Sequence, residues 1–305
     1  NPEDAGVRFN LGIALKANGD LNGAIAAFRD AIRINLCHAS AHLNLGVALE
    51  AELGADLAEL ERLVHGASLI AEVSPRLRAR LMAMGERMST RLGAAYLRQG
   101  GMTVSWVDAT AHLVARDEPG LPPARAMLSA QCAFDPDPTL TAAFTSLDGV
   151  IITQGFIARN SAGETVLLGR GGSDTTAAYL SAKLGACRTE IWTDVPGMFT
   201  ADPRQVPTAL MLRALNYDEA QEIATMGAGV LHPRAIPPCR TAGVPIMIRA
   251  TPRPELEGTI ISTEGGGGEA GVKAISTRRG IMLVSMETMG MWQTVGFLAD
   301  AFAMF

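Results

Sequence analysis

The sequence predicts an α/β fold with a mostly parallel sheet that helices cover on both faces, preceded by a purely helical segment. Two observations carry this prediction. Beyond about residue 100, short apolar runs typical of buried strands alternate with segments of helical pattern. The first 50 residues instead contain a repeated hexapeptide at helical spacing. With 305 residues, 48% of them hydrophobic and 19% charged, the chain can bury a sizeable core and form two or three domains.

The N-terminal segment contains an internal repeat. NLGIAL at Asn10–Leu15 recurs as NLGVAL at Asn44–Leu49, an offset that matches the tetratricopeptide period of about 34 residues. Arg8 and Leu36 stand where that repeat has an aromatic residue and a proline. We expect residues 1–54 to form a tetratricopeptide-like helical hairpin, which either binds a peptide or protein partner or caps the neighbouring domain. Other positions that fit the repeat are Leu11, Gly12, Ala24, Phe28 and Ala31.

The next segment is predicted to be helical up to Gly100-Gly101, with a break near Pro75. Two apolar runs then predict strands, MTVSWVDA from Met102 and LDGVIITQGFIA from Leu147. This alternation places ligands at the carboxyl ends of the strands.

A turn with three glycines lies in TVLLGRGGSDTTAAYL, Thr165–Leu180. Thr165–Leu168 is predicted to be a buried strand, and Ser173 or Asp174 to cap a helix that Gly185 ends. Such a turn lets backbone N–H groups approach a phosphate or a carboxylate at a helix N-terminus. A tight strand-to-helix connection is the simpler interpretation of this turn alone, because it is neither a Walker P-loop nor a dinucleotide fingerprint.

Two further polar loops follow predicted elements of the same domain. Thr193, Asp194, Asp202 and Arg204 come after a strand that ends at Ile191-Trp192. A helix capped by Gly227 leads into residues 230–234, which include a histidine and an arginine. Together with the glycine turn, these loops indicate a site for a nucleotide and its acceptor.

Composition excludes several classes of function. The formal net charge of -5 and the lack of a long basic run argue against a nucleic-acid partner. The sequence predicts no membrane association, because it contains neither an uninterrupted apolar run of spanning length nor a basic secretory start. The chain does not begin with methionine, so it can be a fragment. The four cysteines form no Cys-x-x-Cys pair, which indicates reduced thiols in a cytoplasm. A metal cluster of Cys37, His38 and His42 is less favoured than ordinary helix residues, because no second ligand pair accompanies it.

Four ordered motifs resemble aspartokinases of the amino-acid kinase family. They are LGRGGSDTTAAYLSAKLGA, EIWTDVPGMFTADPR, YDEAQEIATMGAGVLHPR and GVPIMIRATPRPELEGTII. The resemblance covers residues 58–262 and implies an αβα sandwich over 55–263. GIMLVSMETMGMWQTVGFLADAF is similar to the start of a regulatory ACT domain, so 264–305 would be a Gly-rich linker and a truncated ACT-like segment. The segments TDVPGMFTADPR and GMWQTVGFLADAF are most similar in sequence to the kinase half of bifunctional aspartokinase/diaminopimelate decarboxylase proteins.

This resemblance implies transfer of the γ-phosphoryl of ATP, with Mg²⁺, to the side-chain carboxylate of L-aspartate, which opens lysine, threonine and methionine biosynthesis. By the family motifs, Arg170 and Asp174 would be catalytic, and Glu86, Arg170 and Ser173 would bind aspartate. A homodimer through the ACT-like region is also implied. The nucleotide-binding positions would be Gly171, Gly172, Thr193, Asp194, Phe199, Arg204 and Gly229. The effector positions would be Met291, Thr294, Gly296 and Phe297.

Two departures from the family pattern predict impaired catalysis. Aspartokinases begin with a strand that carries a Lys-Phe-Gly-Gly-Thr-Ser motif, and the tetratricopeptide-like segment stands there instead, so the N-terminal strand region is expected to be missing. Gly229 replaces the second nucleotide lysine. Three alternatives therefore remain open: an impaired aspartokinase, a non-catalytic binding or regulatory protein with a degenerate kinase domain, and a gene fragment.

Overall fold

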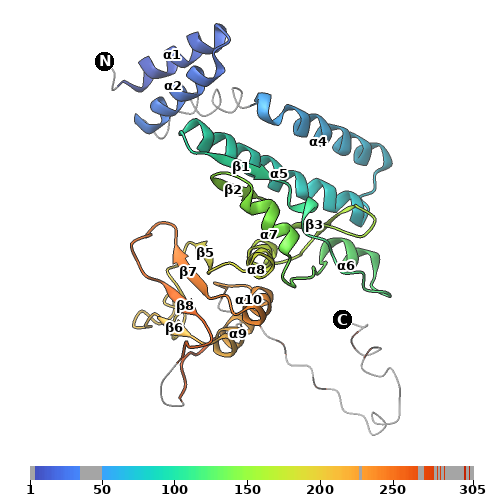
Figure 1. The fold of residues 1–305 in the computed structure, drawn as a ribbon, viewed down its shortest axis with the longest axis vertical. Helices are drawn as coiled ribbons and strands as arrows, with labels where there is room; N and C mark the ends of the chain where they lie inside the picture. Colours follow the sequence, from blue (N-terminus) through green and yellow to red (C-terminus); the bar gives the residue numbers. More distant parts are fainter. Residues whose placement is uncertain are drawn as a thin grey trace.

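The computed structural model describes residues 4–34, 50–226, 229–266 and 271–277, together with the isolated positions 280, 282, 285, 299 and 302. Helices dominate the first hundred residues, and strands and helices alternate after them (Figure 1). No helix among these residues is both long and apolar enough to cross a membrane. Beyond the first helical segments, the elements in order are β1 (Val104–Val107), η1 (Ala109–Ala111), α6 (Pro123–Leu128), α7 (Pro138–Thr145), β2 (Val150–Thr153), β3 (Ile157–Arg159), β4 (Thr165–Leu167), α8 (Gly172–Leu184), β5 (Thr189–Thr193), β6 (Ala214–Leu215), α9 (Tyr217–Thr225), η2 (Pro233–Ala235), α10 (Ile236–Ala242), β7 (Ile246–Ala250) and β8 (Thr259–Ile261).

The N-terminal residues form a helical hairpin of α1 (Ala5–Ala17) and α2 (Leu21–Ile34). Asp4 caps α1 by accepting a hydrogen bond from Gly6 N–H at 2.8 Å. The two helices approach closely where Gly12 meets the buried Phe28, since a methyl group on Gly12 would lie 2.5 Å from that ring. The hairpin itself is confirmed. Its assignment to the tetratricopeptide family stays a prediction, because the second hexapeptide, Asn44–Leu49, lies outside the described residues.

Two long helices follow, α4 (Glu50–Ile70) and α5 (Pro75–Gln99). The predicted break at Pro75 is confirmed, because Ser74 caps α5 by accepting a hydrogen bond from Leu77 N–H at 3.2 Å. Gly100 ends α5, as expected. An ion pair between Arg91 and Asp56, with 2.8 Å between Nη1 and Oδ2, joins the two helices. Helix α5 is therefore held by α4 on one side, and the strands that follow can pack against it.

The α/β fold is confirmed, but the expected single sheet is divided. In the described part of the chain, β1 pairs with β2 and β3 with β4, and β5, β7, β8 and β6 form a four-stranded sheet. The β1–β2, β5–β7 and β6–β8 pairs are parallel, whereas β3–β4 and β7–β8 are antiparallel. The apolar run from Leu147 was predicted as one strand, yet it splits into β2 and β3 at Gly155-Phe156.

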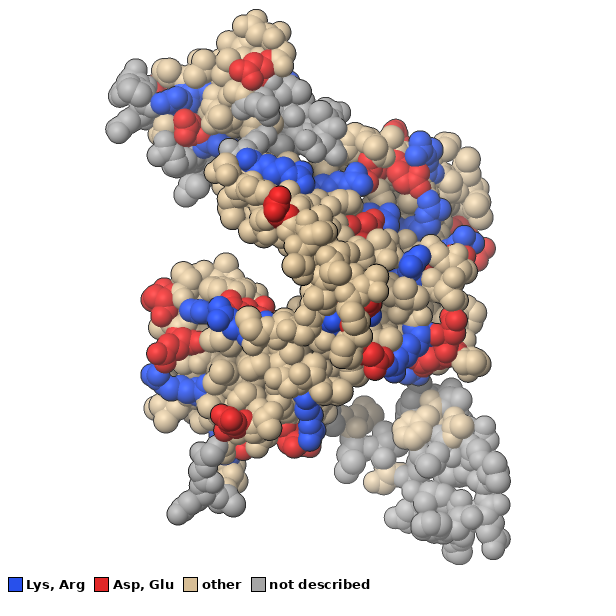
Figure 2. Space-filling view, viewed as in Figure 1, with Lys and Arg blue, Asp and Glu red and all other residues tan. Residues whose placement is uncertain are grey.

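The division of the sheet leaves strand edges without a described partner, among them one edge each of β2 and β5. β2 pairs only with β1, and β5 pairs only with β7. The surface is hollowed between the part that carries α5 and the part that carries the four-stranded sheet (Figure 2). Unpaired strand edges present backbone donors and acceptors that water or another strand must satisfy.

Separate apolar clusters hold the two parts of the α/β region. One packs α9 and α10 against the four-stranded sheet, and the fully buried Ile248 and Leu215 belong to it. Another joins α5 to β3 and β4 through Ala79, Ile157 and Leu167. Helix α8 lies between these parts, and its residues Ala178 and Tyr179 contribute to different clusters. The middle of α8 is therefore packed into two apolar clusters.

Candidate active site

The glycine turn connects β4 to α8. Gly171 is the N-cap of α8 and has a φ of +67°, in the left-handed region that glycine tolerates best. The prediction that Ser173 or Asp174 caps this helix is wrong, because the helix begins at Gly172 and no side chain caps it. The predicted end at Gly185 is confirmed. The first backbone N–H groups of α8 thus have no side-chain acceptor, as an anion site at a helix N-terminus requires.

A loop some sixty residues later in the chain, around His232, packs against this turn. A methyl group on Gly171 would lie 2.1 Å from Cγ of His232, so only glycine fits there. Asp174 Oδ2 accepts a hydrogen bond from His232 N–H at 3.1 Å. Arg234 donates from Nη1 to the carbonyl of Leu168 at 2.6 Å. These contacts bring the glycine turn together with residues 232–234.

His232 has a defined environment within this site. Its Nδ1 accepts a hydrogen bond from Arg234 N–H at 3.3 Å, so the neutral ring carries its proton on Nε2. Burial, followed by the charge of Arg234, lowers the pKa of His232 despite the opposing charge of Asp174. Arg170 contributes to the same lowering, so it lies near enough to act on His232. The Arg170 guanidinium is exposed and has no hydrogen-bond or ion-pair partner among the described residues.

The carboxyl end of β5 lies at the same edge as the glycine turn. Helix α8 leads through a short connection into β5, so the N-terminus of α8 and the C-terminus of β5 lie at the same end. Thr193 is the last residue of β5 and donates from Oγ1 to Asp194 Oδ1 at 3.0 Å. The Asp194 carboxylate is exposed. Thr193 and Asp194 therefore lie at the carboxyl end of β5, and their role in nucleotide binding stays a prediction.

The other predicted nucleotide residues lie on other loops of the same domain. Phe199 forms an antiparallel bridge with Met211, and Arg204 lies exposed in the loop between them. No hydrogen bond or ion pair joins either Phe199 or Arg204 to the glycine turn in the described part of the chain. Gly229 has a φ of +65° and open space where a side chain would begin. The structure thus leaves room for a group at Gly229 but supplies no cation there.

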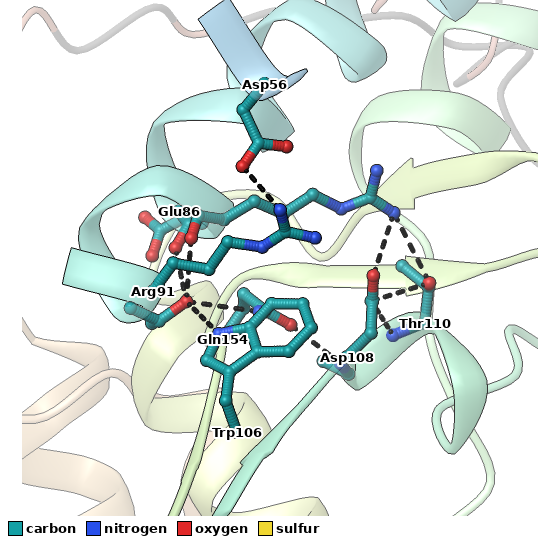
Figure 3. A network of polar contacts seen from close by, with 10 residues as sticks. Asp56, Glu86, Arg91, Trp106, Asp108, Thr110 and Gln154 are labelled. Atoms are coloured by element: carbon teal, nitrogen blue, oxygen red, sulfur yellow. Dashed lines mark hydrogen bonds and ion pairs between the residues drawn. The ribbon is translucent and has the colours of Figure 1, made fainter. Parts of the chain in front are cut away.

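Glu86 lies on α5, and its backbone carbonyl belongs to a polar network that Figure 3 shows from close by. Its carboxylate is half-buried, and this burial raises the pKa of Glu86. Thr90 Oγ1 donates to the Glu86 carbonyl at 2.8 Å and accepts from Gln154 Nε2 at 3.1 Å. Glu86 is therefore more buried than a solvated helix residue, and a cationic ligand would stabilise its charged form.

Sequence reasoning missed part of this site. His232 and Arg234 were placed on a polar loop without a role, and Phe156, Thr176 and Gln154 were not singled out. Only the glycine before Phe156 gave a local signal of a turn. The predicted effector residues lie outside the described residues, so they stay predictions: Met291, Thr294, Gly296 and Phe297.

Comparison with known proteins identifies the class to which this arrangement belongs. A family model described as the amino acid kinase family matches residues 24–250. The chain therefore belongs to the amino acid kinase family. The match begins within α2, inside the segment that we assign to the tetratricopeptide-like hairpin, so the boundary at residue 54 stays a prediction.

The resemblance to aspartokinases is confirmed as well. The chain is 36% identical over 250 residues to lysine-sensitive aspartokinase 3 of Escherichia coli (strain K12), covering 80% of this chain and 54% of that protein. The structure of E. coli aspartokinase III in complex with aspartate and ADP matches with a TM-score of 0.60 and 31% identity, over 84% of this chain and 55% of that one. Its complex with lysine and aspartate gives 0.62 and 28%, over 97% and 64%. The chain thus spans about half the length of aspartokinase 3.

Proposed function

We propose that this chain carries the catalytic part of an aspartokinase-type enzyme, which transfers the γ-phosphoryl of ATP to the side-chain carboxylate of L-aspartate, and that the transfer is slow here. The observation that carries the proposal is the uncapped glycine turn of α8, packed on His232 and tied to it through Asp174. The similarity to E. coli aspartokinase III, solved with aspartate and ADP, supports both substrates. We also expect a cytoplasmic location, because Cys132, Cys187 and Cys239 form no disulfide among the described residues.

The nucleotide would be held at the edge formed by α8 and β5. Backbone N–H groups at Gly171 and Gly172 and the positive end of α8 suit the phosphates. Thr193 and Asp194 would bind polar groups of the nucleotide. Arg204 would add a cation, and Phe199 an apolar wall. Phosphoryl transfer depends mainly on such positioning and charge neutralisation. The substrate carboxylate is itself the nucleophile, so the protein does not have to supply one.

The acceptor would lie between Arg170, Ser173 and Glu86. An exposed guanidinium without a protein partner is available for bidentate binding of a carboxylate. The Ser173 side chain is exposed at the first turn of α8. Glu86, whose pKa burial raises, would bind the ammonium group of the amino acid. These groups match the two carboxylates and one ammonium of L-aspartate.

A magnesium ion would arrive with the nucleotide. No group of three or more histidine, cysteine or acidic side chains suited to a metal occurs among the described residues. Asp174 does offer a carboxylate in which Oδ2 accepts from His232 N–H. One carboxylate fits Mg²⁺ when phosphates and water supply the other ligands, and the ion would then neutralise phosphate charge. Asp174 would orient the ion and the glycine turn together.

Slow transfer is expected because both cations of the family pattern are absent. Gly229 offers open space where the family has a lysine. Among the described residues, no strand with the other lysine of the family pattern pairs with the free edge of β2 or of β5. Removing one electrostatic partner of a developing charge commonly costs on the order of a hundredfold to a thousandfold in rate. Arg170 and the helix N-terminus would leave a residual activity.

Trapping of aspartyl phosphate tests the proposal. The full chain is incubated with ATP, Mg²⁺, L-aspartate and hydroxylamine, and the aspartyl hydroxamate is quantified. We expect slow, aspartate-dependent formation that Arg170→Ala abolishes. Arg78→Ala is the matched control, because Arg78 is also exposed and without a described partner but lies near the start of α5. Equal rates in the two variants, or no product above an enzyme-free blank, would contradict the proposal.

A non-catalytic binding protein is the second candidate, and Gly229 together with the divided sheet favours it. Saturable ATP binding by calorimetry without any hydroxamate would support this alternative. In that case the tetratricopeptide-like hairpin would recruit a peptide or protein partner, and the ACT-like region would pair two chains. A chain that neither binds ATP nor stays monodisperse would instead be a gene fragment.

A further inference from the structure

Phe156 adopts an unusual backbone conformation beside the candidate site. Its φ is +71°, and among the described residues Ala71 is the only other non-glycine residue with positive φ. A bulky residue in this region costs conformational energy, so it persists only where the surroundings hold it. Phe156 lies between β2 and β3, where the apolar run is interrupted. The contacts that hold it therefore indicate what the turn is for.

One buried hydroxyl ties Phe156 to the glycine turn. Phe156 N–H donates to Thr176 Oγ1 at 2.9 Å, and the same hydroxyl donates to the carbonyl of Gly172 at 2.9 Å. Thr176 is only 3% exposed. The aromatic ring lies so close to Gly172 that a methyl group there would be 2.5 Å from Cδ2. The strained turn and the first turn of α8 are thus directly linked.

Gln154, two residues before Phe156, ties the same turn to α5. Gln154 is fully buried, and its Oε1 accepts from Ala109 N–H at 2.7 Å. Its Nε2 donates to Thr90 Oγ1 at 3.1 Å, and Thr90 donates in turn to the carbonyl of Glu86 (Figure 3). Residues 154–156 therefore connect the helix that carries Glu86 to the helix that carries the glycine turn.

We infer that Gln154 and Thr176 are positioning residues, which fix the separation between Glu86 on α5 and the glycine turn on α8 and thereby set the affinity for an amino-acid substrate. The inference rests on the proposed function. An amino acid presents its ammonium and carboxylate groups at a fixed separation, so two binding groups on different elements must be held within about half an ångström of the productive geometry. Neither Gln154 nor Thr176 needs to touch the substrate to do this.

Substitutions at two neighbouring threonines separate positioning from stability. Thr176→Val removes the hydroxyl but keeps the shape, and Thr176→Ser restores the hydroxyl. Thr175→Val is the matched control, because Thr175 is 0% exposed and donates to the carbonyl of Gly171 at 2.8 Å without any bond to Phe156. We expect Thr176→Val to weaken L-aspartate binding about tenfold, the worth of one hydrogen bond, and Thr176→Ser to recover it. Calorimetry with ADP and Mg²⁺ present measures the affinity.

The matched control decides the outcome of the binding experiment. Thr175→Val should leave the affinity within about twofold of the original chain. Equal losses in Thr175→Val and Thr176→Val would mean that any buried hydroxyl of α8 matters equally, and that result overturns the inference.

Hydrogen exchange tests the connection without any substrate. Thr176→Val should speed amide exchange at Phe156 and, through Gln154, also at Ala109, whereas Thr175→Val should affect α8 alone. Faster exchange that stops at Phe156 would overturn the inference. If the original chain binds no aspartate while exchange spreads to Ala109, the proposed substrate fails but the positioning connection stands.

Discussion

Gly229→Lys tests the site through a gain of function. The substitution returns an ammonium to the loop that leads into His232. One charge-assisted hydrogen bond to a phosphate is worth about 1.5–3 kcal/mol, so ATP affinity should rise by about ten- to a hundredfold. The space is open, since nothing lies within 4 Å of an added Cβ. Isothermal titration calorimetry with Mg²⁺ and ATP measures the change.

The backbone of Gly229 sets a cost that appears in stability and not in binding. At a φ of +65°, a lysine pays about 1–2 kcal/mol for the left-handed conformation. That strain is present with and without nucleotide, so it lowers the free energy of unfolding and leaves the gain in affinity intact. Gly185→Lys is the matched control: its φ is +59°, its surroundings are equally open, and it ends α8 away from the glycine turn.

Two results would refute this reasoning. The first is an equal gain in ATP affinity in Gly229→Lys and Gly185→Lys, which would mean that general positive charge, not the loop, attracts the nucleotide. The second is robust aspartyl hydroxamate formation from Gly229→Lys alone. Interactions made only in the transition state govern the rate, and the other lysine of the family pattern would still be absent. We expect fast turnover only when an aspartokinase N-terminal segment also replaces residues 1–54.

Three further predictions concern single residues. Asp194→Ala should abolish ATP binding in the same calorimetric assay, because it removes the exposed carboxylate that Thr193 orients at the end of β5; an unchanged affinity would show that the nucleotide binds elsewhere. Phe156→Gly should be more stable to urea than Phe156→Ala by about 1 kcal/mol, because both lose the ring but only glycine relieves the positive φ; the reverse order would argue against strain at this turn. Burial raises the pKa of Glu86, so the native state binds that proton more tightly than the unfolded state, and stability should fall as pH rises from the ordinary value of 4.5 through the raised pKa. Glu86→Gln should flatten this part of the profile in thermal melts, and an unaltered slope would assign it to other groups.

Local sequence signals predicted the elements that depend on local physics. Ser74 and Pro75 at the start of α5 and Gly185 at the end of α8 are capping signals that act within one turn of helix. The strand β4 was also predicted from local sequence, because a short run of β-branched and apolar residues bounded by glycine favours a buried strand. The family motifs also predict which polar side chains form the site, and that assignment stays a prediction.

Contacts between distant segments decided the rest. The sequence near Gly171 gives no sign that His232 fills the space beside it. This contact excludes a side chain at the N-cap position, which is Gly171 and not the predicted Ser173 or Asp174. Phe156 has positive φ because Thr176 and Gly172, some twenty residues later in the chain, hold it there. The division of the sheet has the same origin: strands pair only when another segment supplies the facing edge, and that pairing energy is absent from any local pattern.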